Sequence, residues 1–320
     1  YSLGEFQYPW REWNDYYRDA VRQFWLGDIA RGFGEGVSAL ASSISGSSNI
    51  FYFRGPTTSI NFITAHDGFT MNDLVTYHEK RNLPNEEDNR DGNNSNRSWN
   101  VGHEGPTNDP KINQIRQSLQ KSMMATLLLS SGVPMVTMGD EVGRTQHGSN
   151  NAFTVPIDLN RNNWDKEVAW FGGWTLDWNP TGDKKDLQDA FIELIRIRKT
   201  YLSDITSEFF TGRVDFGTER KDIAWFSLSG NEMTDAHWSD GDKRSLTVFF
   251  EAGPKTGLVL FMNSFGEETT FTLPSSAWGE SMRCIFDSFE TTATYNPALA
   301  APGDKVQVSP HSLQVWLVNR

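Results

Sequence analysis

The sequence predicts the C-terminal part of a (β/α)8 TIM barrel in residues 1–203, followed by an antiparallel β-sandwich domain in residues 204–320. In the first region short apolar strands alternate with amphipathic helices, and the long loops follow the strands, where barrel active sites are built. In the second region short alternating segments are separated by turn signals, which is typical of a sandwich. The first region has two clear strands, or three with a short one near Trp10. So few strands cannot close an eight-stranded barrel.

The first element is an amphipathic helix over Arg11–Trp25, whose apolar residues recur at three- and four-residue spacing. A glycine- and serine-rich stretch follows from Gly32 to Ser48. Ile60–Ala65 is then a short apolar strand, and it ends in the polar turn His66-Asp67-Gly68. A long polar segment connects this turn to the next helix.

That second helix is predicted over Lys111–Ser131, with Gly132 as the residue just after its C-cap. Val133–Met138 is apolar throughout, as expected of a parallel strand that is buried on both faces. After another long loop, a third helix is predicted over Asp183–Tyr201, with Asp183 as its N-cap.

The sandwich is predicted from seven short segments that alternate or are continuously apolar, with turns such as Ser-Gly-Asn between them. They are Ile223–Leu228, Leu246–Glu251, Gly257–Asn263, Thr269–Leu273, Met282–Asp287, Lys305–Val308 and Leu313–Val318.

Composition excludes several classes of partner. No apolar run approaches the roughly 18 residues of a membrane span, and the net charge of −12 without a basic stripe disfavours a nucleic-acid partner. Cys284 is the only cysteine, so neither an intrachain disulfide nor a thiolate zinc site is possible. We expect Cys284 to be a core residue and the setting to be reducing and cytoplasmic. The N-terminus shows no signal peptide and no initiator Met, which suggests a fragment.

The strongest catalytic signal is FITAHDGFT, at Phe62–Thr70. An acidic residue at the end of an apolar strand, next to a histidine and followed by glycine, stands where a barrel enzyme places a catalytic group. Asp67 is therefore the candidate catalytic residue. A purely structural turn is the alternative.

The longer stretch from Asn61 to Pro110 resembles the α-amylase superfamily of glycoside hydrolases (glycoside hydrolase family 13). Within that superfamily it is similar to the bacterial glycogen debranching, isoamylase-type branch. The segments WREWNDYYRDAVRQFW, LLLSSGVPMVTMGDEVGRTQHGSNNAF and IAWFSLSGNEMTDAHW are similar to that branch as well. The resemblance covers nearly the entire chain.

The resemblance implies a retaining hydrolase that cleaves α-1,6 branch linkages in glycogen or limit dextrin. Such chemistry needs a carboxylate nucleophile and a carboxylic acid that protonates the leaving oxygen, and it needs no cofactor. In this superfamily a third carboxylate, at the end of barrel strand seven, is essential because it binds sugar hydroxyls and favours the distorted, oxocarbenium-like transition state. Asp67 matches this third position. His66 matches the histidine that hydrogen-bonds the sugar before the cleaved bond.

The family places the nucleophile at the end of barrel strand four and the acid at the end of strand five, so both would lie upstream of Tyr1. Neither Asp140-Glu141 nor the acidic residues of Glu86–Asp91 stand in a matching motif. We therefore expect the N-terminal part of the barrel to be missing and the chain alone to be catalytically incomplete.

Gly139-Asp140-Glu141 resembles the family's last barrel strand, and we expect both acids to orient loops by hydrogen bonds. The polar loop after it supplies candidate substrate-binding residues, namely Arg144, Gln146, Asn150 and Asn151. Beyond them, TVPIDLNRNNWDKEVAWFGG departs from the family pattern before Leu176–Trp178. Branch-point geometry and preferred chain length therefore stay open.

The loop Glu86–Gly105 has calcium binding as an alternative. Aligning Gly92 with the invariant glycine of an EF-hand puts Ser98 where glutamate is required, and no helix pair flanks the loop. We therefore expect a solvated substrate loop and no metal.

Two other functions stay open. One is a non-catalytic α-glucan-binding module, formed by the sandwich and the Trp-rich loops. The other is a pullulanase or α-1,4-glucan hydrolase, because the superfamily shares its catalytic carboxylates across these activities. In each case the expected partner is a neutral α-glucan. An open barrel also exposes strand edges, which pair with other chains, so a homo-oligomer is a further expectation.

Overall fold

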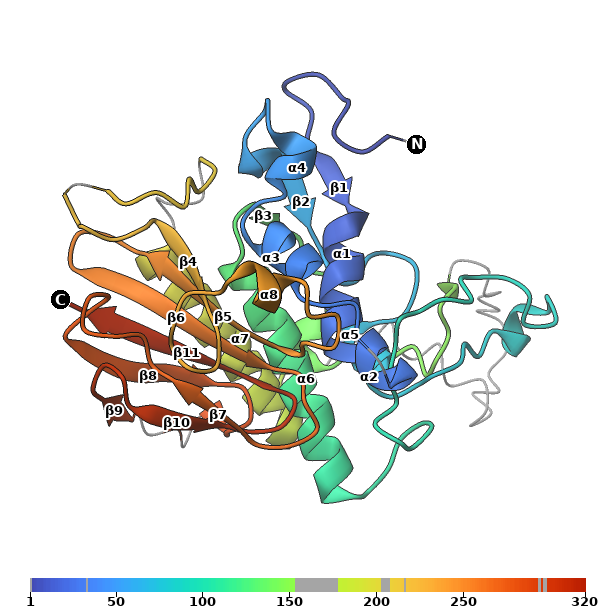
Figure 1. Ribbon diagram of the computed structural model, residues 1–320. Helices are drawn as coiled ribbons and strands as arrows, with labels where there is room; N and C mark the ends of the chain where they lie inside the picture. The colour runs from blue at the N-terminus through green and yellow to red at the C-terminus, as the bar shows by residue number, and fades with distance from the viewer. Residues whose placement is uncertain are drawn as a thin grey trace.

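The computed structural model of the protein describes residues 2–32, 34–152, 178–202, 208–215, 217–292, 295 and 298–320. A small parallel sheet and two long helices lie beside two antiparallel sheets (Figure 1). The segment at residues 154–173, where the sequence departs from the family pattern, lies outside the described residues. So does the predicted boundary between residues 203 and 204.

The parallel sheet has the strand order β1-β2-β3, with β1 at Glu12–Asn14, β2 at Ser59–Asn61 and β3 at Val133–Pro134. The short strand expected near Trp10 is thus present. The strands predicted at Ile60–Ala65 and Val133–Met138 form sheet hydrogen bonds over fewer residues than these apolar runs. In β3, Pro134 has no backbone N–H to donate to the neighbouring strand.

The prediction that Val133–Met138 is buried on both faces is wrong. Residues 133–137 are half-buried, and Met138 is 67% exposed. The reason is that β3 has, among the described residues, a neighbouring strand on one side only.

The helix predicted from Arg11 begins at Asp15, directly after β1. The Asn14 side chain caps it by accepting a hydrogen bond from the Tyr17 backbone N–H at 2.9 Å. The helical chain then continues through α1 (Asp15–Arg22), the π-helical η1 (Gln23–Gly27) and α2 (Asp28–Arg31). Because no loop separates β1 from α1, this helical run projects from the C-terminal edge of the parallel sheet (Figure 1).

Several short helices connect the main elements, and the first of them lies in the glycine- and serine-rich stretch. They are α3 (Ser38–Ile44), α4 (Ser48–Phe51), η2 (Pro56–Thr58), α5 (Met71–Leu74), η3 (Leu83–Asn85) and η4 (Asp140–Val142).

The two long helices are α6 (Pro110–Leu129) and α7 (Gly182–Tyr201), close to their predicted bounds. Their caps differ from the prediction, because α6 ends at the C-cap Ser130 rather than before Gly132, and α7 has Thr181 as its N-cap instead of Asp183. No helix in the described part of the chain combines the length and apolarity that a membrane span requires.

The C-terminal part contains two antiparallel sheets, one with the order β4-β5-β6-β11-β8-β9 and one that pairs β10 with β7. All seven predicted strands are present, and the two-residue β9 is an addition. The strands are β4 (Ile223–Phe226), β5 (Ser245–Glu251), β6 (Thr256–Asn263), β7 (Thr269–Thr272), β8 (Ser281–Asp287), β9 (Leu299–Ala300), β10 (Lys305–Val308) and β11 (Ser312–Asn319). A short helix, α8 (Asp235–Trp238), lies between β4 and β5.

Both faces of the six-stranded sheet are covered, which explains why β6 is apolar from Leu258 to Met262. Leu258 and Leu260 belong to the core that includes α6 and α7, whereas Val259 and Phe261 pack in a second core against the smaller sheet. Cys284 lies in this second core, as expected, and burial raises the pKa of its thiol to about 12.

Helix α6 is joined to the antiparallel sheets by buried polar contacts. Ser118 donates a hydrogen bond to the His311 carbonyl at 2.8 Å, and Ser122 lies 2.9 Å from the Ser288 hydroxyl. The Lys121 ammonium pairs with Asp186 of α7 and also donates to the Glu290 carbonyl at 2.9 Å. The contacts of Ser118, Ser122 and Lys121 with the segments of Ser288, Glu290 and His311 would be broken if the two parts separated, whereas Lys121 and Asp186 both belong to the helices.

This junction is expected to be acid-sensitive through His311, which is 5% exposed. Burial lowers the pKa of its imidazole from 6.5 to about 4. Between pH 6.5 and pH 4 the imidazole therefore takes up a proton when the protein unfolds. The corresponding stability is present above pH 6.5 and is lost as the pH falls towards 4, by about 3 kcal/mol at most. Urea unfolding at pH 7 and pH 4 measures this loss. His311→Asn, which cannot titrate, should lose less over the same range, and equal losses would contradict the assignment.

Candidate active site

A polar cavity of about 390 Å³ lies at the C-terminal end of β2. Its walls come from α1, from the chain after β2, from the loop at residues 92–97 and from Asn150 and Asn151. Because the ends of parallel strands meet at one edge of a sheet, segments far apart in sequence converge here.

Asp67 is carried to this cavity by the chain that leaves β2. Phe62, Ile63 and Thr64 are buried, and His66 and Asp67 then emerge as exposed residues. Gly68 follows at φ +79°, a left-handed conformation that favours glycine, and its N–H donates to the Asn150 carbonyl at 2.9 Å.

Of the two candidate site residues in the predicted turn, Asp67 lines the cavity and His66 does not. The His66 ring instead lies against the Trp13 ring of β1, with centroids 5.8 Å apart. His66 and Asp67 are therefore neighbours on the exposed rim, with an aromatic surface beside them.

Arg22 fixes the base of the cavity. Its guanidinium is buried, donates twice to the Ile63 carbonyl, at 2.8 and 2.5 Å, and once to the Asn96 carbonyl at 3.2 Å. Burial lowers the pKa of Arg22 to about 9. This side chain ties the chain just before Asp67 to the opposite loop.

A second acid, Asp19, also lines the cavity. It is engaged in ion pairs with Arg18 at 2.7 Å and with Arg97 at 2.8 Å. Asp19 is therefore held as a charged, paired group, whereas the Asp67 side chain makes no hydrogen bond to other residues in the described part of the chain.

The polar loop after η4 contributes Asn150 and Asn151 to the cavity wall. The buried Asn150 amide donates to the Asn93 carbonyl at 2.7 Å and to Asn96 Oδ1 at 2.8 Å. Asn151 is half-buried and donates to Asp91 at 3.0 Å. Both amides hold two loops together at the rim.

Two buried carboxylates hold the chain segments that follow β2 and η4. Asp140 accepts hydrogen bonds from the Thr64 hydroxyl and from the Met71 N–H at 3.1 Å, as expected of a loop-orienting residue. Asp73 accepts from the Thr145 hydroxyl and from the Gln146 N–H at 2.7 Å. Burial raises the pKa of each carboxyl to about 6.

Arg144 and Gln146 are not among the residues that line the Asp67 cavity. The Arg144 backbone N–H donates to the Gly139 carbonyl at 2.9 Å, within the turn of η4. Glu141 accepts a hydrogen bond from the Gly139 N–H at 2.7 Å. The structure thus brings Asn150 and Asn151 to Asp67, and leaves Arg144 and Gln146 outside.

Two polar side chains of the loop considered for calcium are bound by residues that directly precede it. Asn89 accepts from the Asn82 N–H at 2.7 Å, and Asp91 accepts from the Asn85 amide at 2.7 Å. Within the described ranges, no group of three His, Cys, Asp or Glu side chains is arranged to hold a metal ion.

Sequence reasoning missed four charged residues of the cavity, namely Arg18, Asp19, Arg22 and Arg97. A signal was available for the first three. They lie in a helix that follows the strand directly, without a loop. The first turns of such a helix must lie near the C-terminal end of the strand, which is where the site is expected. Arg97 had no comparable signal, since the long loop around it has no periodicity.

The comparisons with solved structures concern the fold. The pullulanase from Bacillus acidopullulyticus superposes with a TM-score of 0.55 over 96% of this chain and 30% of that one, at 16% identity. The catalytic module of the pneumococcal glycogen-degrading virulence factor SpuA superposes with a TM-score of 0.59 over 97% of this chain and 44% of that one, at 15% identity. The chain therefore shares the fold of part of these glycoside hydrolases.

The sequence comparisons are more specific. Residues 222–319 match the family "Isoamylase, C-terminal". The chain is 36% identical to the glycogen operon protein GlgX homolog of Mycobacterium tuberculosis, over 98% of its own length and 43% of that relative. It is 37% identical to the glycogen debranching enzyme of Yersinia pestis, over 87% of its length and 38% of that relative.

These matches confirm the predicted resemblance to isoamylase-type, glycogen-debranching proteins. The chain spans less than half the length of the curated relatives that it matches.

Proposed function

We propose that this chain supplies the C-terminal part of a glycogen debranching glycoside hydrolase, which cleaves α-1,6 branch linkages in glycogen or limit dextrin. In this proposal Asp67 is the third carboxylate of a retaining mechanism. It binds sugar hydroxyls in the −1 position and favours the positively charged, oxocarbenium-like transition state. His66 donates a hydrogen bond to the same sugar.

The observation that carries the proposal is the placement of Asp67. It is exposed on a cavity at the C-terminal end of a parallel strand, and the loop after the next strand forms the opposite rim. A carboxylate free of internal hydrogen bonds, among three arginines and several amides, is suited to ligand contact rather than to stabilising a turn.

The remaining catalytic parts are proposed to come from the portion of the relatives that this chain does not span. Asp19, the only other acid on the described cavity wall, is held in two ion pairs, and Asp140 is buried. Neither is suited to act as a nucleophile or a proton donor.

The free edge of β1 supports the same proposal. Among the described residues β1 pairs only with β2, and large aromatic side chains just before β1 and just after α4 are exposed. They include Tyr8 at 87%, Trp10 at 67% and Phe53 at 95%. Further βα units of a (β/α)8 barrel would cover this surface, with residues 1–203 as the barrel part and residues 204–320 as the sandwich domain.

The chain alone is expected to release no reducing sugar from a branched limit dextrin, because it holds one of the three required carboxylates. The same chain joined to the portion that it lacks, taken from a curated relative, should release linear maltooligosaccharides. Reducing-end assays of both proteins test this expectation. Turnover by the 320-residue chain that Asp67→Asn abolishes would contradict the division of the catalytic groups.

A further inference from the structure

The long polar segment after β2 and the loop after η4 are joined by a pair of buried amides, Asn82 and Asn150. Asn82 is 0% exposed and Asn150 is 2% exposed. Asn82 Nδ2 donates to Asn150 Oδ1 at 2.7 Å, and Asn82 Oδ1 accepts from the Asn150 backbone N–H at 3.1 Å. Two hydrogen bonds thus connect one asparagine side chain to both the side chain and the backbone of the other.

Asn82 uses the rest of its amide within the protein as well. Its Nδ2 also donates to the Asp91 carbonyl at 3.0 Å, and its Oδ1 also accepts from the Ser149 hydroxyl at 3.2 Å. An amide side chain has two N–H donors and an oxygen with two lone pairs, so each of these is occupied. Asn82 is not among the residues that line the Asp67 cavity. It is therefore suited to hold chain segments and not to bind a ligand.

Asn150 connects the amide pair to Asp67. The Asn150 carbonyl accepts a hydrogen bond from the Gly68 N–H at 2.9 Å, and Gly68 directly follows Asp67 in the chain. The position of the Asn150 backbone, which Asn82 binds, therefore determines where the turn that carries Asp67 is held.

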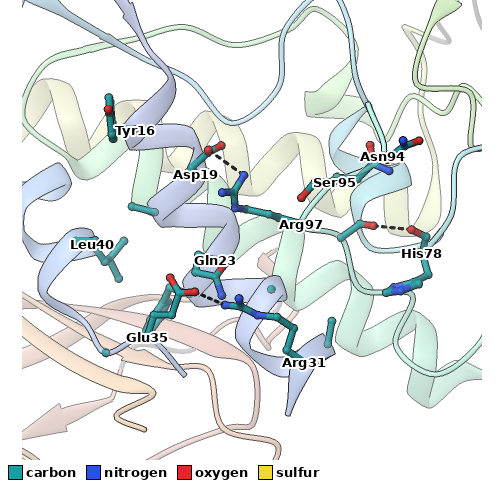
Figure 2. A pocket seen from close by; sticks show the side chains of 18 residues that line it. Tyr16, Asp19, Gln23, Arg31, Glu35, Leu40, His78, Asn94, Ser95 and Arg97 are labelled. Atoms are coloured by element: carbon teal, nitrogen blue, oxygen red, sulfur yellow. Dashed lines mark hydrogen bonds and ion pairs between the residues drawn. The ribbon is translucent and has the colours of Figure 1, made fainter. Parts of the chain in front are cut away.

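The same amide pair also holds the opposite wall of the cavity. Asn150 Nδ2 donates to Asn96 Oδ1 at 2.8 Å, within the loop at residues 92–97. From another side of this loop, Arg97 reaches Asp19 of α1 and pairs with it at 2.8 Å (Figure 2). The loop is thus fixed at both places, and one of them depends on Asn150.

Gly92 shows how closely the amide pair is packed. It lies at φ +72°, and a Cβ at this position would overlap Asn150 Oδ1 and lie 2.8 Å from Asn82 Nδ2. Any larger residue therefore has to push the two amides apart. Gly102, in the same polar segment, has a similar φ of +78°, but a Cβ there would meet no atom within 4 Å. The two glycines share a backbone conformation and differ in what surrounds them.

We infer that Asn82 is a positioning residue for Asp67, which it orients through Asn150 and Gly68 without touching the substrate. The inference rests on the proposed function, in which Asp67 binds sugar hydroxyls. A binding carboxylate has to be held within about 0.5 Å of its productive position, and hydrogen bonds behind the site supply that constraint. Loss of the amide pair should therefore loosen the Gly68 hydrogen bond and weaken the sugar contact of Asp67.

The first test needs no ligand. Asn82→Ala and Gly92→Ala disrupt the amide pair, one by removal and one by overlap, and Gly102→Ala is the matched control. Hydrogen exchange of the Gly68 amide, measured by NMR on the 320-residue chain, should become about five- to tenfold faster in the first two variants and stay unchanged in the control. Gly92 is exposed, so its variant decides the test even where Asn82→Ala does not fold. Unchanged Gly68 exchange in folded Gly92→Ala would overturn the inference and leave the proposed function standing.

The second test separates positioning from general destabilisation. The affinity for maltotetraose, measured by titration calorimetry, should fall about three- to tenfold in Asn82→Ala and in Gly92→Ala. Neither change should weaken binding further in a chain that already carries Asp67→Asn, because both act through the carboxylate that this substitution removes. Losses that add to that of Asp67→Asn would overturn the inference alone. A chain that binds no maltotetraose, or binds it equally well with Asp67→Asn, would contradict the proposed role of Asp67 and the inference with it.

Discussion

Asp67→Asn is expected to lower hydrolysis of a branched limit dextrin by about 100- to 1000-fold, in the chain joined to the portion of its relatives that it lacks. The substitution keeps the size of the side chain and removes its negative charge. In the role that we propose for Asp67, that charge stabilises the positive charge that develops on the sugar, and a preorganised electrostatic contact of this kind contributes about 10²–10³ to the rate. The loss should therefore appear mainly in kcat.

The matched control is Asp88→Asn. Asp88 lies in the exposed part of the polar loop, with its side chain 87% exposed, and it is not among the residues that line the cavity. Its replacement should leave kcat and KM unchanged. An Asp67→Asn enzyme with full kcat would show that Asp67 belongs to a structural turn.

Lys121→Met is expected to cause the largest loss of folding stability, about 3–5 kcal/mol. Lys121 is 1% exposed and pairs with Asp186, which is itself 9% exposed. Removing the ammonium leaves a buried carboxylate without its counter-charge and the Glu290 carbonyl without its donor. The free energy of unfolding in urea measures the loss.

Two further variants make this prediction specific to burial. Lys185→Met removes an exposed partner of Asp189 on the same helix and should change stability by less than about 0.5 kcal/mol. Replacing both buried partners, as Lys121→Met with Asp186→Leu, should recover part of the loss, since no buried charge then remains unpaired. A double variant that is no more stable than Lys121→Met would contradict the electrostatic explanation.

The antiparallel part was predictable because its signals are local. Each strand is a short apolar or alternating run between turns, and the predicted Lys305–Val308 matches β10 at both ends. The long helices were equally predictable from their periodicity. Their caps were not predictable from periodicity. The caps are Ser130 and Thr181 instead of the predicted ends at Gly132 and Asp183, because the backbone conformation at each helix end decides the cap.

The candidate site was predictable only in part. Asp67 carries a local signal, as an acid at the end of an apolar strand. Arg144 and Asn151 look alike in sequence, as polar residues of one loop, yet only Asn151 reaches the Asp67 cavity. The separation arises because the η4 turn holds Arg144 near Gly139, while the amides of Asn82 and Asn96 hold Asn150. Such tertiary hydrogen bonds have no periodic signature.

A crystal structure of this chain with maltotetraose tests directly whether Asp67 is a sugar-binding carboxylate on an open cavity. We predict a glucose ring in the cavity at the end of β2, with its hydroxyls within hydrogen-bond distance of the Asp67 carboxylate and the His66 ring. A maltotetraose bound only elsewhere, with the Asp67 carboxylate facing solvent or turned into the protein, would contradict the account.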